Sequence, residues 1–388
     1  MPLKPEPQKI KQKPSYASVP FLLFSSFIVV TLAILSLRAF PRLSLLSNHL
    51  ALPANFAPRA IFFSTNAKNP LPTMSSYAKE LEVAQLAVQR ASILTKRVFH
   101  EKAKGTVDKN DKSPVTIGDF GAQALIIAAL RHHFPQDEIV AEEEAAQLRS
   151  DAGLRDQIWD LVRTTKLEDA QAETLLGGPI ETAESMLDLI DLGNSKGGSS
   201  GRIWAIDPID GTKGFLRGGQ YAVCLALMVD GDVKGATSRP LQSGAIADGA
   251  SISMKPITEM SAATFCESVE AGHSAHDDQA QIAAKLGITK PSVRMDSQSK
   301  YGSIARGAGD IYLRLPVKAT YQEKIWDHAA GDLIVREAGG QVTDIQGKRL
   351  DFSVGRTLAN NKGVIAAPAA VHETVLKVVQ EVLSQKSS

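Results

Sequence analysis

A run of nine residues, Tyr221 to Val229 (YAVCLALMV), places the strongest limit on how this chain can fold. Strands with one face in water alternate apolar and polar residues, whereas this run is apolar almost throughout. It therefore predicts a central strand that is covered on both faces and paired along both edges. A strand of this kind needs helices or another sheet on each side, so we expect a layered α/β or α+β fold.

Helical and strand patterns alternate from Met74 onward. Apolar residues at helical spacing predict a helix that begins after Ser75 and Ser76, and a second helix is expected from Asp119 until Pro135 ends it. Further strands are expected at residues 138–141, 203–206, 310–315 and 364–367. A helix at residues 327–338, stopped by Gly339 and Gly340, and a C-terminal helix complete the pattern. No internal repeat is visible.

Charge is distributed unevenly along the 388 residues. Residues 1–73 carry a net charge of +7 and the remainder a net charge of −6. A mildly acidic body argues against a nucleic-acid polymer as the main partner, because phosphate backbones select basic surfaces. The only cysteines, Cys224 and Cys266, lie in apolar contexts without metal-ligand spacing, which favours a reducing compartment and a cytoplasmic catalytic body.

The N-terminal extension, residues 1–73, contains an uncharged run at residues 21–37 that would span about 26 Å as a helix. Three interpretations stay open. The run is a membrane anchor near the short limit of length, or the basic extension is an organelle-targeting presequence such as a mitochondrial one, or Met74 is the working start of the protein. Under the first two, the protein is membrane-associated or mitochondrial. We also expect that nothing before Met74 belongs to the core.

The string WAIDPIDGTKGF ends an apolar strand in an acidic turn. Pro208 fixes φ and Gly211 permits the bend, so that Asp207, Asp210 and the Ile209 carbonyl can converge on one point. Such an arrangement suits a hard divalent cation with oxygen ligands. A solvated Asp-Gly turn is the commoner meaning of a bare D-x-x-D-G pattern, but the full string favours a site.

Two other acidic positions can likewise be interpreted either as metal ligands or as ordinary structural residues. The glutamates at residues 142–144 follow a short strand and could be a solvated helix start, and Asp327 could be a helix cap. Two unit charges 4 Å apart repel by about 4 kcal/mol at an effective dielectric constant of 20. If these carboxylates converge, the site must therefore hold metal.

Several strings together resemble a known family. The strings VAEEE, WAIDPIDGTKGFLRGGQYAVCLALMVDG and KIWDHAAGDLIVREAGGQVTD resemble the lithium-sensitive, magnesium-dependent phosphomonoesterases of the inositol monophosphatase superfamily. DKSPVTIGDFGAQ, VEAGHSAHDDQ and MDSQSKYGSIARGAGDIYLRLP are similar to the fungal 3′(2′),5′-bisphosphate nucleotidases within it. The resemblance covers nearly all of residues 74–388. It implies a layered αβαβα sandwich of two domains, at residues 74–240 and 241–388, with the metal site between them.

Matched by motif, the resemblance implies a role for each of several residues. The implied ligands of two or three Mg²⁺ ions are Glu142, Asp207, the carbonyl of Ile209, Asp210 and Asp327. Asp119 and Thr212 would orient and deprotonate the attacking water. The implied substrate-binding residues are Gly211, Thr212, His273, Ser297, Lys300 and Arg314. His132 and His133 match no family role and are interpreted as ordinary helix residues.

The implied reaction is hydrolysis of the 3′-phosphate of adenosine 3′,5′-bisphosphate to AMP and phosphate, with 3′-phosphoadenylyl sulfate as a second substrate. One departure from the family pattern bears on how active the protein is. About two strands are missing between Val233 and Lys234, which indicates either lost coding sequence or an impaired protein. The alternatives are a weakly active nucleotide-binding relative and a related inositol-phosphate phosphatase.

Overall fold

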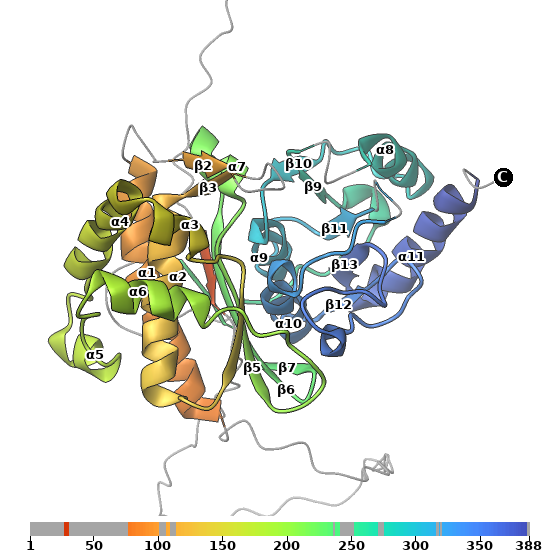
Figure 1. Ribbon diagram of the computed structural model, residues 1–388. Coiled ribbons are helices and arrows are strands. Elements are labelled where there is room, and N and C mark those ends of the chain that lie inside the picture. Colours follow the sequence, from red (N-terminus) through yellow and green to blue (C-terminus); the bar gives the residue numbers. More distant parts are fainter. Residues whose placement is uncertain are drawn as a thin grey trace, which may run out of the picture.

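The protein is described here from a computed structural model, in which residues 27–30, 77–100, 106–108, 114–235, 237–240, 252–270, 275–315, 318 and 320–385 are placed. Two mixed β-sheets and three layers of helices alternate across the molecule (Figure 1). The expected αβαβα layering is therefore confirmed. Three hydrophobic clusters fill the spaces between the layers, which explains why so many strand residues are buried on both faces.

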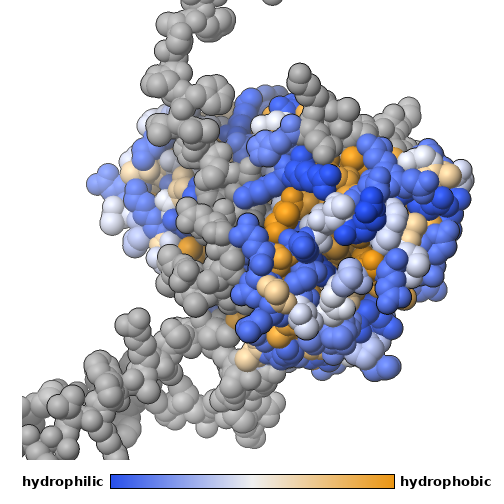
Figure 2. All heavy atoms as spheres, turned by 90° about the vertical axis from the view of Figure 1, so that its left-hand side faces the viewer, coloured by the Kyte–Doolittle hydropathy of each residue, from blue (hydrophilic) through white to orange (hydrophobic). Residues whose placement is uncertain are grey.

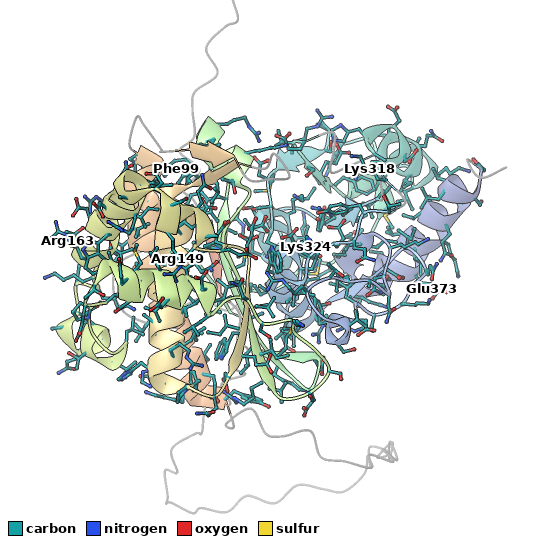
Figure 3. All side chains as sticks on the ribbon, in the orientation of Figure 1. Phe99, Arg149, Arg163, Lys318, Lys324 and Glu373 are labelled. Atoms are coloured by element: carbon teal, nitrogen blue, oxygen red, sulfur yellow. The ribbon has the colours of Figure 1, made fainter. Side chains whose placement is uncertain are left out.

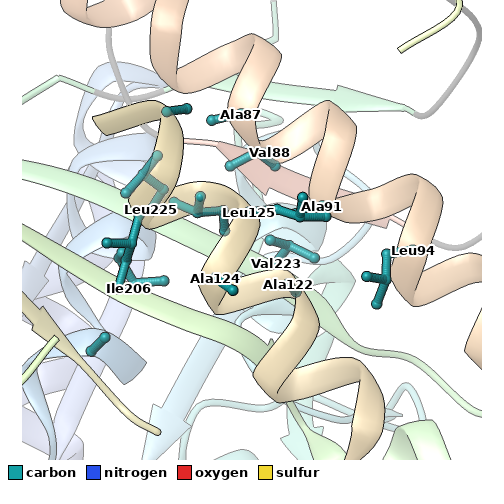
Figure 4. Packing of buried hydrophobic residues seen from close by; sticks show 14 of the residues in the cluster. Ala87, Val88, Ala91, Leu94, Ala122, Ala124, Leu125, Ile206, Val223 and Leu225 are labelled. Atoms are coloured by element: carbon teal, nitrogen blue, oxygen red, sulfur yellow. The ribbon is translucent and has the colours of Figure 1, made fainter. Parts of the chain in front are cut away.

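Two long helices form the first layer. Helix α1 spans Ala78–His100 and helix α2 spans Ile117–His133, and both pack against the first sheet. Figure 4 shows small residues of the two helices, among them Ala91 and Ala122, close to Val223 and Leu225 of the sheet. The apolar residues that predicted α1 are all buried, so the helical spacing identified its packed face correctly.

The first sheet has four strands in the order β4-β5-β6-β7. Their bounds are Glu138–Ala141, Arg202–Asp210, Ala222–Val229 and Asp232–Gly235. Strands β4 and β5 are parallel, whereas β5, β6 and β7 are antiparallel. Along β6, Val223, Leu225 and Leu227 face the α1/α2 layer, and the residues between them face the opposite layer. Both faces of β6 are covered, as its composition predicted.

Shorter helices and strands lie between the elements of the α1/α2 layer and the first sheet in the chain. They are β2 (Thr106–Asp108), β3 (Pro114–Thr116), α3 (Ala146–Ser150), α4 (Ala152–Thr164), α5 (Ala170–Leu175), α6 (Ala183–Asp191) and α7 (Thr212–Arg217).

The side of the molecule in Figure 2 shows hydrophilic residues around smaller hydrophobic patches. Isolated exposed apolar residues are common on globular proteins and define no interface.

The second sheet has five strands in the order β10-β9-β11-β13-β12. Their bounds are Val293–Met295, Phe265–Ser268, Ile311–Arg314, Val364–Pro368 and Gly340–Thr343. Helices α8 (His276–Lys285) and α11 (Ala369–Ser384) cover its outer face. Short 3₁₀ turns lie at Met260–Ala262, Ile325–Asp327 and Phe352–Val354.

The middle layer consists of α9 (Ser299–Ala305) and α10 (Ala329–Glu337). Their apolar residues share one cluster with the inner faces of both sheets. The two sheets are therefore joined through these helices, and residues at the ends of β4, β5 and α10 come together at the junction.

The N-terminal run at residues 21–37 differs from expectation where it is described. Phe27–Val30 forms strand β1, which pairs antiparallel with β8 (Thr237–Pro240) and contacts α1 and β6. The expectations of a helix there and of no core contact before Met74 are wrong for these four residues. In the described part of the chain, no helix combines the length and apolar character needed to cross a membrane. The remaining residues up to 76 lie outside the description.

Strand β6 is paired unequally on its two edges. Strand β5 accompanies it along its length, but β7 pairs only with Leu227, Met228 and Val229. Over residues 222–226, none of the described strands is hydrogen-bonded to the edge of β6 on which β7 lies. Among the described strands, pairing on both edges is therefore found only at Leu227, Met228 and Val229. That the strands expected to be missing after Val233 would lie along this edge stays a prediction.

Candidate metal centre

The acidic turn lies at the end of β5, where the pairing with β6 shifts between Asp207 and Asp210. Gly211 follows with φ of +93°, a conformation that L side chains rarely adopt. A Cβ at Gly211 would also lie 2.8 Å from Cβ of Ser297, so glycine is needed for both reasons. Asp207 is 2% exposed, and its Oδ1 has no hydrogen-bond partner. Such an atom is expected where a ligand is bound.

The carboxylates of the turn raise one another's pKa values. Burial, and then the Glu142 and Asp210 carboxylates, hold the pKa of Asp207 well above its usual range. Burial also raises the pKa of Asp210 to about 6, although Lys300 and the backbone N–H of Gln298 act in the opposite direction. Burial, and then Asp210, raise the pKa of Asp327 to about 7. Glu142, Asp207, Asp210 and Asp327 therefore share one electrostatic environment, as their motifs predicted.

Glu142 reaches this environment from β4. Ala141 is paired with Ile206, so the carboxyl ends of the parallel strands β4 and β5 lie side by side. The next residue, Glu143, is fixed by buried Gln123 of α2. Gln123 donates from Nε2 to the Glu143 carbonyl over 2.7 Å and accepts from the Glu143 N–H over 2.9 Å. The backbone beside Glu142 is therefore held against α2.

Asp119 and Thr212 lie on the same side of the turn. Oδ2 of Asp119 accepts from the N–H of Thr116 over 2.8 Å and from its hydroxyl over 2.6 Å. Thr116 is the N-cap of α2, so the helix begins at Ile117 and not at Asp119, and Asp119 completes a capping box. The Thr212 hydroxyl lies 3.5 Å from Oδ1 of Asp119 and 3.2 Å from the Ile209 carbonyl.

Asp327 lies in a 3₁₀ turn and not at the start of a helix. The N-cap of α10 is His328, so the alternative meaning of Asp327 as an ordinary helix cap does not apply. Figure 3 places Lys324, which precedes this turn, where the two halves of the molecule meet. Arg356 contacts both sides of this junction. Its Nη2 donates to the Ala141 carbonyl over 2.7 Å, and its guanidinium lies 4.8 Å from the centre of the Trp326 ring. It thus contacts the residue before Glu142 and the residue before Asp327.

A second group of potential ligand atoms lies beside the first. In the described residues, Glu323, Asp327 and His328 form a set whose ligand atoms all lie within 4.8 Å of one another. Glu323 already accepts from Nε of Arg314 over 2.8 Å, and both ring nitrogens of His328 are engaged by Glu323 and Tyr301. Burial would raise the pKa of Glu323, but Arg314 and His328 outweigh it and lower the pKa to about 2. This group is an ion-pair network.

The expected substrate-binding residues have different surroundings. Lys300 is 1% exposed, and its ammonium lies 3.4 Å from the Met295 carbonyl and 5.2 Å from the centre of the Tyr312 ring. Burial lowers the pKa of Lys300 to about 8, against the effect of Asp210. Ser297 has φ of +61° and lies beside Gly211. Arg314 is partly buried and bound to Glu323. His273 lies outside the described residues.

Sequence reasoning did not single out Gln123, Gln298, Glu323 or Arg356. Gln123 and Gln298 lie inside the quoted strings DKSPVTIGDFGAQ and MDSQSKYGSIARGAGDIYLRLP, where their polar side chains could have been noticed, and Glu323 directly precedes the string that begins KIWDH. The interpretation of His132, His133 and the two cysteines as ordinary residues agrees with the structure. His132 is exposed, His133 contacts the Leu175 carbonyl, and both cysteines are buried and free.

Buried carboxylates that lie together at the junction of two sheets suit a divalent metal ion, which is the group that metal-dependent phosphatases use to polarise a phosphoryl group. The residue pattern of the inositol monophosphatase family matches residues 77–384, and the chain belongs to this family. It is 61% identical to a 3′(2′),5′-bisphosphate nucleotidase of Emericella nidulans, over 79% of this chain and 99% of that protein. It is 45% identical to a protein of the same name from Schizosaccharomyces pombe, over 80% of this chain and 97% of that protein.

Solved structures support the fold. The extragenic suppressor protein suhB of Bartonella henselae matches with a TM-score of 0.54 at 18% identity, covering 78% of this chain and 99% of that one. An IMPase of Thermotoga maritima matches with a TM-score of 0.51 at 23% identity, covering 79% and 98%. At such identities the comparison establishes the inositol monophosphatase-like fold and no more.

The alignment with the Emericella nidulans protein bears on the missing strands. It is 349 positions long, whereas 79% of this 388-residue chain is about 307 residues. About 40 positions therefore have no residue of this chain opposite them, which is more than enough for two strands with their connections. The location of this gap after Val233 stays a prediction.

Proposed function

We propose that this chain is a 3′(2′),5′-bisphosphate nucleotidase that hydrolyses the 3′-phosphate of adenosine 3′,5′-bisphosphate to AMP and phosphate, with 3′-phosphoadenylyl sulfate as a second substrate. The observation that carries the proposal is the 61% identity to a curated protein of that name along almost its whole length. The acidic cluster supplies the chemistry that such a reaction needs.

The donor set fits Mg²⁺. Oxygen atoms are the ligands that this cation prefers, and the unpartnered Oδ1 of Asp207 together with the raised pKa values of Asp207, Asp210 and Asp327 mark buried carboxylates whose charge nearby cations do not fully compensate. We assign two or three ions to a set made of Glu142, Asp207, the Ile209 carbonyl, Asp210 and Asp327. Bound there, Mg²⁺ supplies Lewis-acid polarisation of the phosphoryl group and charge stabilisation of the leaving oxygen.

The chain's own residues then act on the attacking water. Asp119 is fixed by two hydrogen bonds from Thr116 to its Oδ2, so its Oδ1 is directed toward the Thr212 hydroxyl. We assign Asp119 as the proton acceptor and Thr212 as the group that relays or orients the proton. The distance of 3.5 Å between them is long, as catalytic hydrogen bonds often are before substrate binds.

The phosphate that does not react needs cations of its own. We assign Lys300 and Arg314 to the 5′-phosphate, with Gly211, Thr212, His273 and Ser297 completing the substrate site. We expect Arg314→Ala to raise KM more than it lowers kcat, since contacts to a non-reacting group affect ground state and transition state alike. Steady-state kinetics measure this, and a large loss in kcat with unchanged KM would contradict the assignment. Glu323→Gln should have a smaller effect in the same direction, because Glu323 orients Arg314.

Two alternatives have a specific observation behind them. The incomplete pairing of β6 favours a weakly active nucleotide-binding relative, and the family match favours an inositol-phosphate phosphatase. One assay separates them: phosphate release from adenosine 3′,5′-bisphosphate and from inositol phosphates, with Mg²⁺ and with EDTA. We expect release from the bisphosphate only, and only with Mg²⁺. Release from inositol phosphates alone, or none from a protein that binds the nucleotide, would replace our proposal by one of the alternatives.

We further propose that the body has two units, residues 74–240 and 241–388. The strands of the first sheet all fall in the first range and those of the second sheet in the second. The free thiols of Cys224 and Cys266 support a reducing compartment such as the cytoplasm for this body. Whether residues 21–37 attach it to a membrane or residues 1–73 direct it to an organelle is decided by locating a full-length fluorescent fusion against one that starts at Met74.

A further inference from the structure

Gln298 makes hydrogen bonds to both sides of the metal centre. The residue is 1% exposed and lies between β10 and α9. Its backbone N–H donates to Oδ2 of Asp210 over 2.8 Å. Its side-chain Nε2 donates to the Trp326 carbonyl over 2.8 Å, and its Oε1 accepts from the Gly331 N–H over 2.8 Å. One buried residue thus contacts the turn after β5 and the turn before α10.

The side chain of Gln298 bonds to backbone groups on both sides of Asp327. The Trp326 carbonyl belongs to the peptide bond that leads into Asp327. Gly331 is the third residue of α10, and its N–H has no partner inside the helix. The N-cap residue His328 provides no side-chain cap, so Gln298 satisfies this N–H instead. The carboxamide therefore fixes the backbone on both sides of Asp327.

Only a carboxamide suits this position. It needs a donor for the Trp326 carbonyl and an acceptor for the Gly331 N–H, and it must be neutral beside Asp207, Asp210 and Asp327. A carboxylate would lack the donor and add negative charge, whereas an apolar side chain of similar size would leave two buried backbone groups without partners.

From these contacts we infer that Gln298 is a positioning residue for the metal centre, which sets the separation of Asp210 and Asp327 before Mg²⁺ binds. The inference rests on the proposed function, since that proposal makes both acids metal ligands. Residues that orient metal ligands typically change metal affinity or activity by about 10- to 100-fold when they are replaced.

The test uses the full chain and measures Mg²⁺ binding by calorimetry without nucleotide, alongside the melting temperature in EDTA and steady-state kinetics. We expect Gln298→Met to weaken Mg²⁺ binding by about 10- to 100-fold. Near-parental KM for adenosine 3′,5′-bisphosphate is expected at saturating Mg²⁺, because the substrate contacts remain. Gln298→Asn, which is too short to bridge both groups, should weaken Mg²⁺ binding to a similar degree and is the second variant.

Asn361→Leu is the matched control. Asn361 is also buried, and its carboxamide makes three hydrogen bonds, to Asp344, Arg349 and Asp351. Its replacement should lower the melting temperature without changing the Mg²⁺ affinity. If Gln298→Met or Gln298→Asn behaves like this control, or if neither variant folds, Gln298 serves the fold and the inference is overturned. If the parent protein neither binds Mg²⁺ nor releases phosphate, the proposed function fails instead.

Discussion

At the residue scale, the acids of the metal centre are held together against their own repulsion. Asp207 is almost fully buried without a partner for Oδ1, and burial raises the pKa values of Asp210 and Asp327 to about 6 and about 7. Each pKa unit corresponds to about 1.4 kcal/mol of difference between the two protonation states. Without a cation this cluster is therefore a source of instability, which the Mg²⁺ that we propose would remove.

Asp210→Asn should abolish turnover while leaving the fold intact. Asparagine can still accept the hydrogen bond from the Gln298 N–H, but it carries no charge for a metal ion. We expect kcat to fall at least about 100-fold, which is about 2.7 kcal/mol of transition-state stabilisation. The melting temperature in EDTA should rise, because a buried charge is removed. Phosphate release and thermal unfolding measure both effects, and Asp232→Asn, at an exposed position, is the control. Near-parental turnover by Asp210→Asn would remove Asp210 from the metal centre.

The raised pKa values also predict how stability depends on pH. Between about pH 4 and pH 7 the folded protein holds protons on Asp210 and Asp327 that the unfolded chain has released. The free energy of unfolding therefore falls as the pH rises through this window. Urea unfolding in EDTA should show a less stable protein at pH 8 than at pH 5.

Mg²⁺ should weaken or reverse this dependence. The ion binds deprotonated carboxylates, so it competes with protons at low pH and stabilises the folded protein more at pH 8 than at pH 5. Urea unfolding repeated in Mg²⁺ at both pH values gives the comparison. The same pH dependence with and without Mg²⁺ would mean that Asp210 and Asp327 are not the groups that bind the ion.

At the element scale, the proposed metal ligands come from different elements, and long-range contacts set their spacing. Glu142 follows β4, Asp207 and Asp210 end β5, and Asp327 precedes α10. Arg356 contacts the backbone before Glu142 and the ring before Asp327, and so connects the two halves of the site.

Arg356→Lys should raise the Mg²⁺ concentration needed for half-maximal activity by about tenfold or more. Lysine keeps the charge but lacks the planar fork that reaches the carbonyls of Ala141, Gly193 and Ser195 together. Phosphate release titrated with Mg²⁺ measures the shift. Arg163→Lys on the outer helix α4, labelled in Figure 3, is the control and should leave it unchanged. An unaltered titration for Arg356→Lys would show that the hydrogen bonds of the Arg356 guanidinium do not help to position the proposed ligands.

The sequence predicts elements whose causes are local. Strand β4 has the expected bounds of 138–141, and β6 starts one residue later than its apolar run. Helix α2 starts two residues early because its cap, Thr116, ends the preceding strand β3, which no helical spacing indicates.

The acidic turn could also be predicted, because Pro208 and Gly211 shape it within four residues. The contacts of Gln298 with Trp326 and of Arg356 with Ala141 could not, since they join segments 28 and 215 residues apart in the chain. Only the folded arrangement of both sheets brings them together.

At the scale of the whole molecule, the sheet that carries the acidic turn is incompletely paired in the described part of the chain. There, β7 pairs with β6 only at Leu227, Met228 and Val229, and about 40 positions of the Emericella nidulans protein have no counterpart in this chain. Strand β1, which pairs with β8, contacts β6. An incompletely paired strand exposes backbone donors and acceptors, which favours aggregation.

Restoring the missing segment from the Emericella nidulans protein after Val233 should therefore raise both stability and activity. Lost apolar burial costs about 25 cal/mol per Å², which is large against a net stability of about 5–15 kcal/mol. Removal of residues 1–73 should lower the melting temperature of the chain as written, because β1 then no longer contacts β6, but should have little effect once the segment is restored. Melting temperature, size-exclusion chromatography and phosphate release of the four proteins measure this. If the chain as written is monodisperse and as active as the restored form, the β6 edge needs no further strands. If removal of residues 1–73 has the same effect in both backgrounds, β1 does not compensate for their loss.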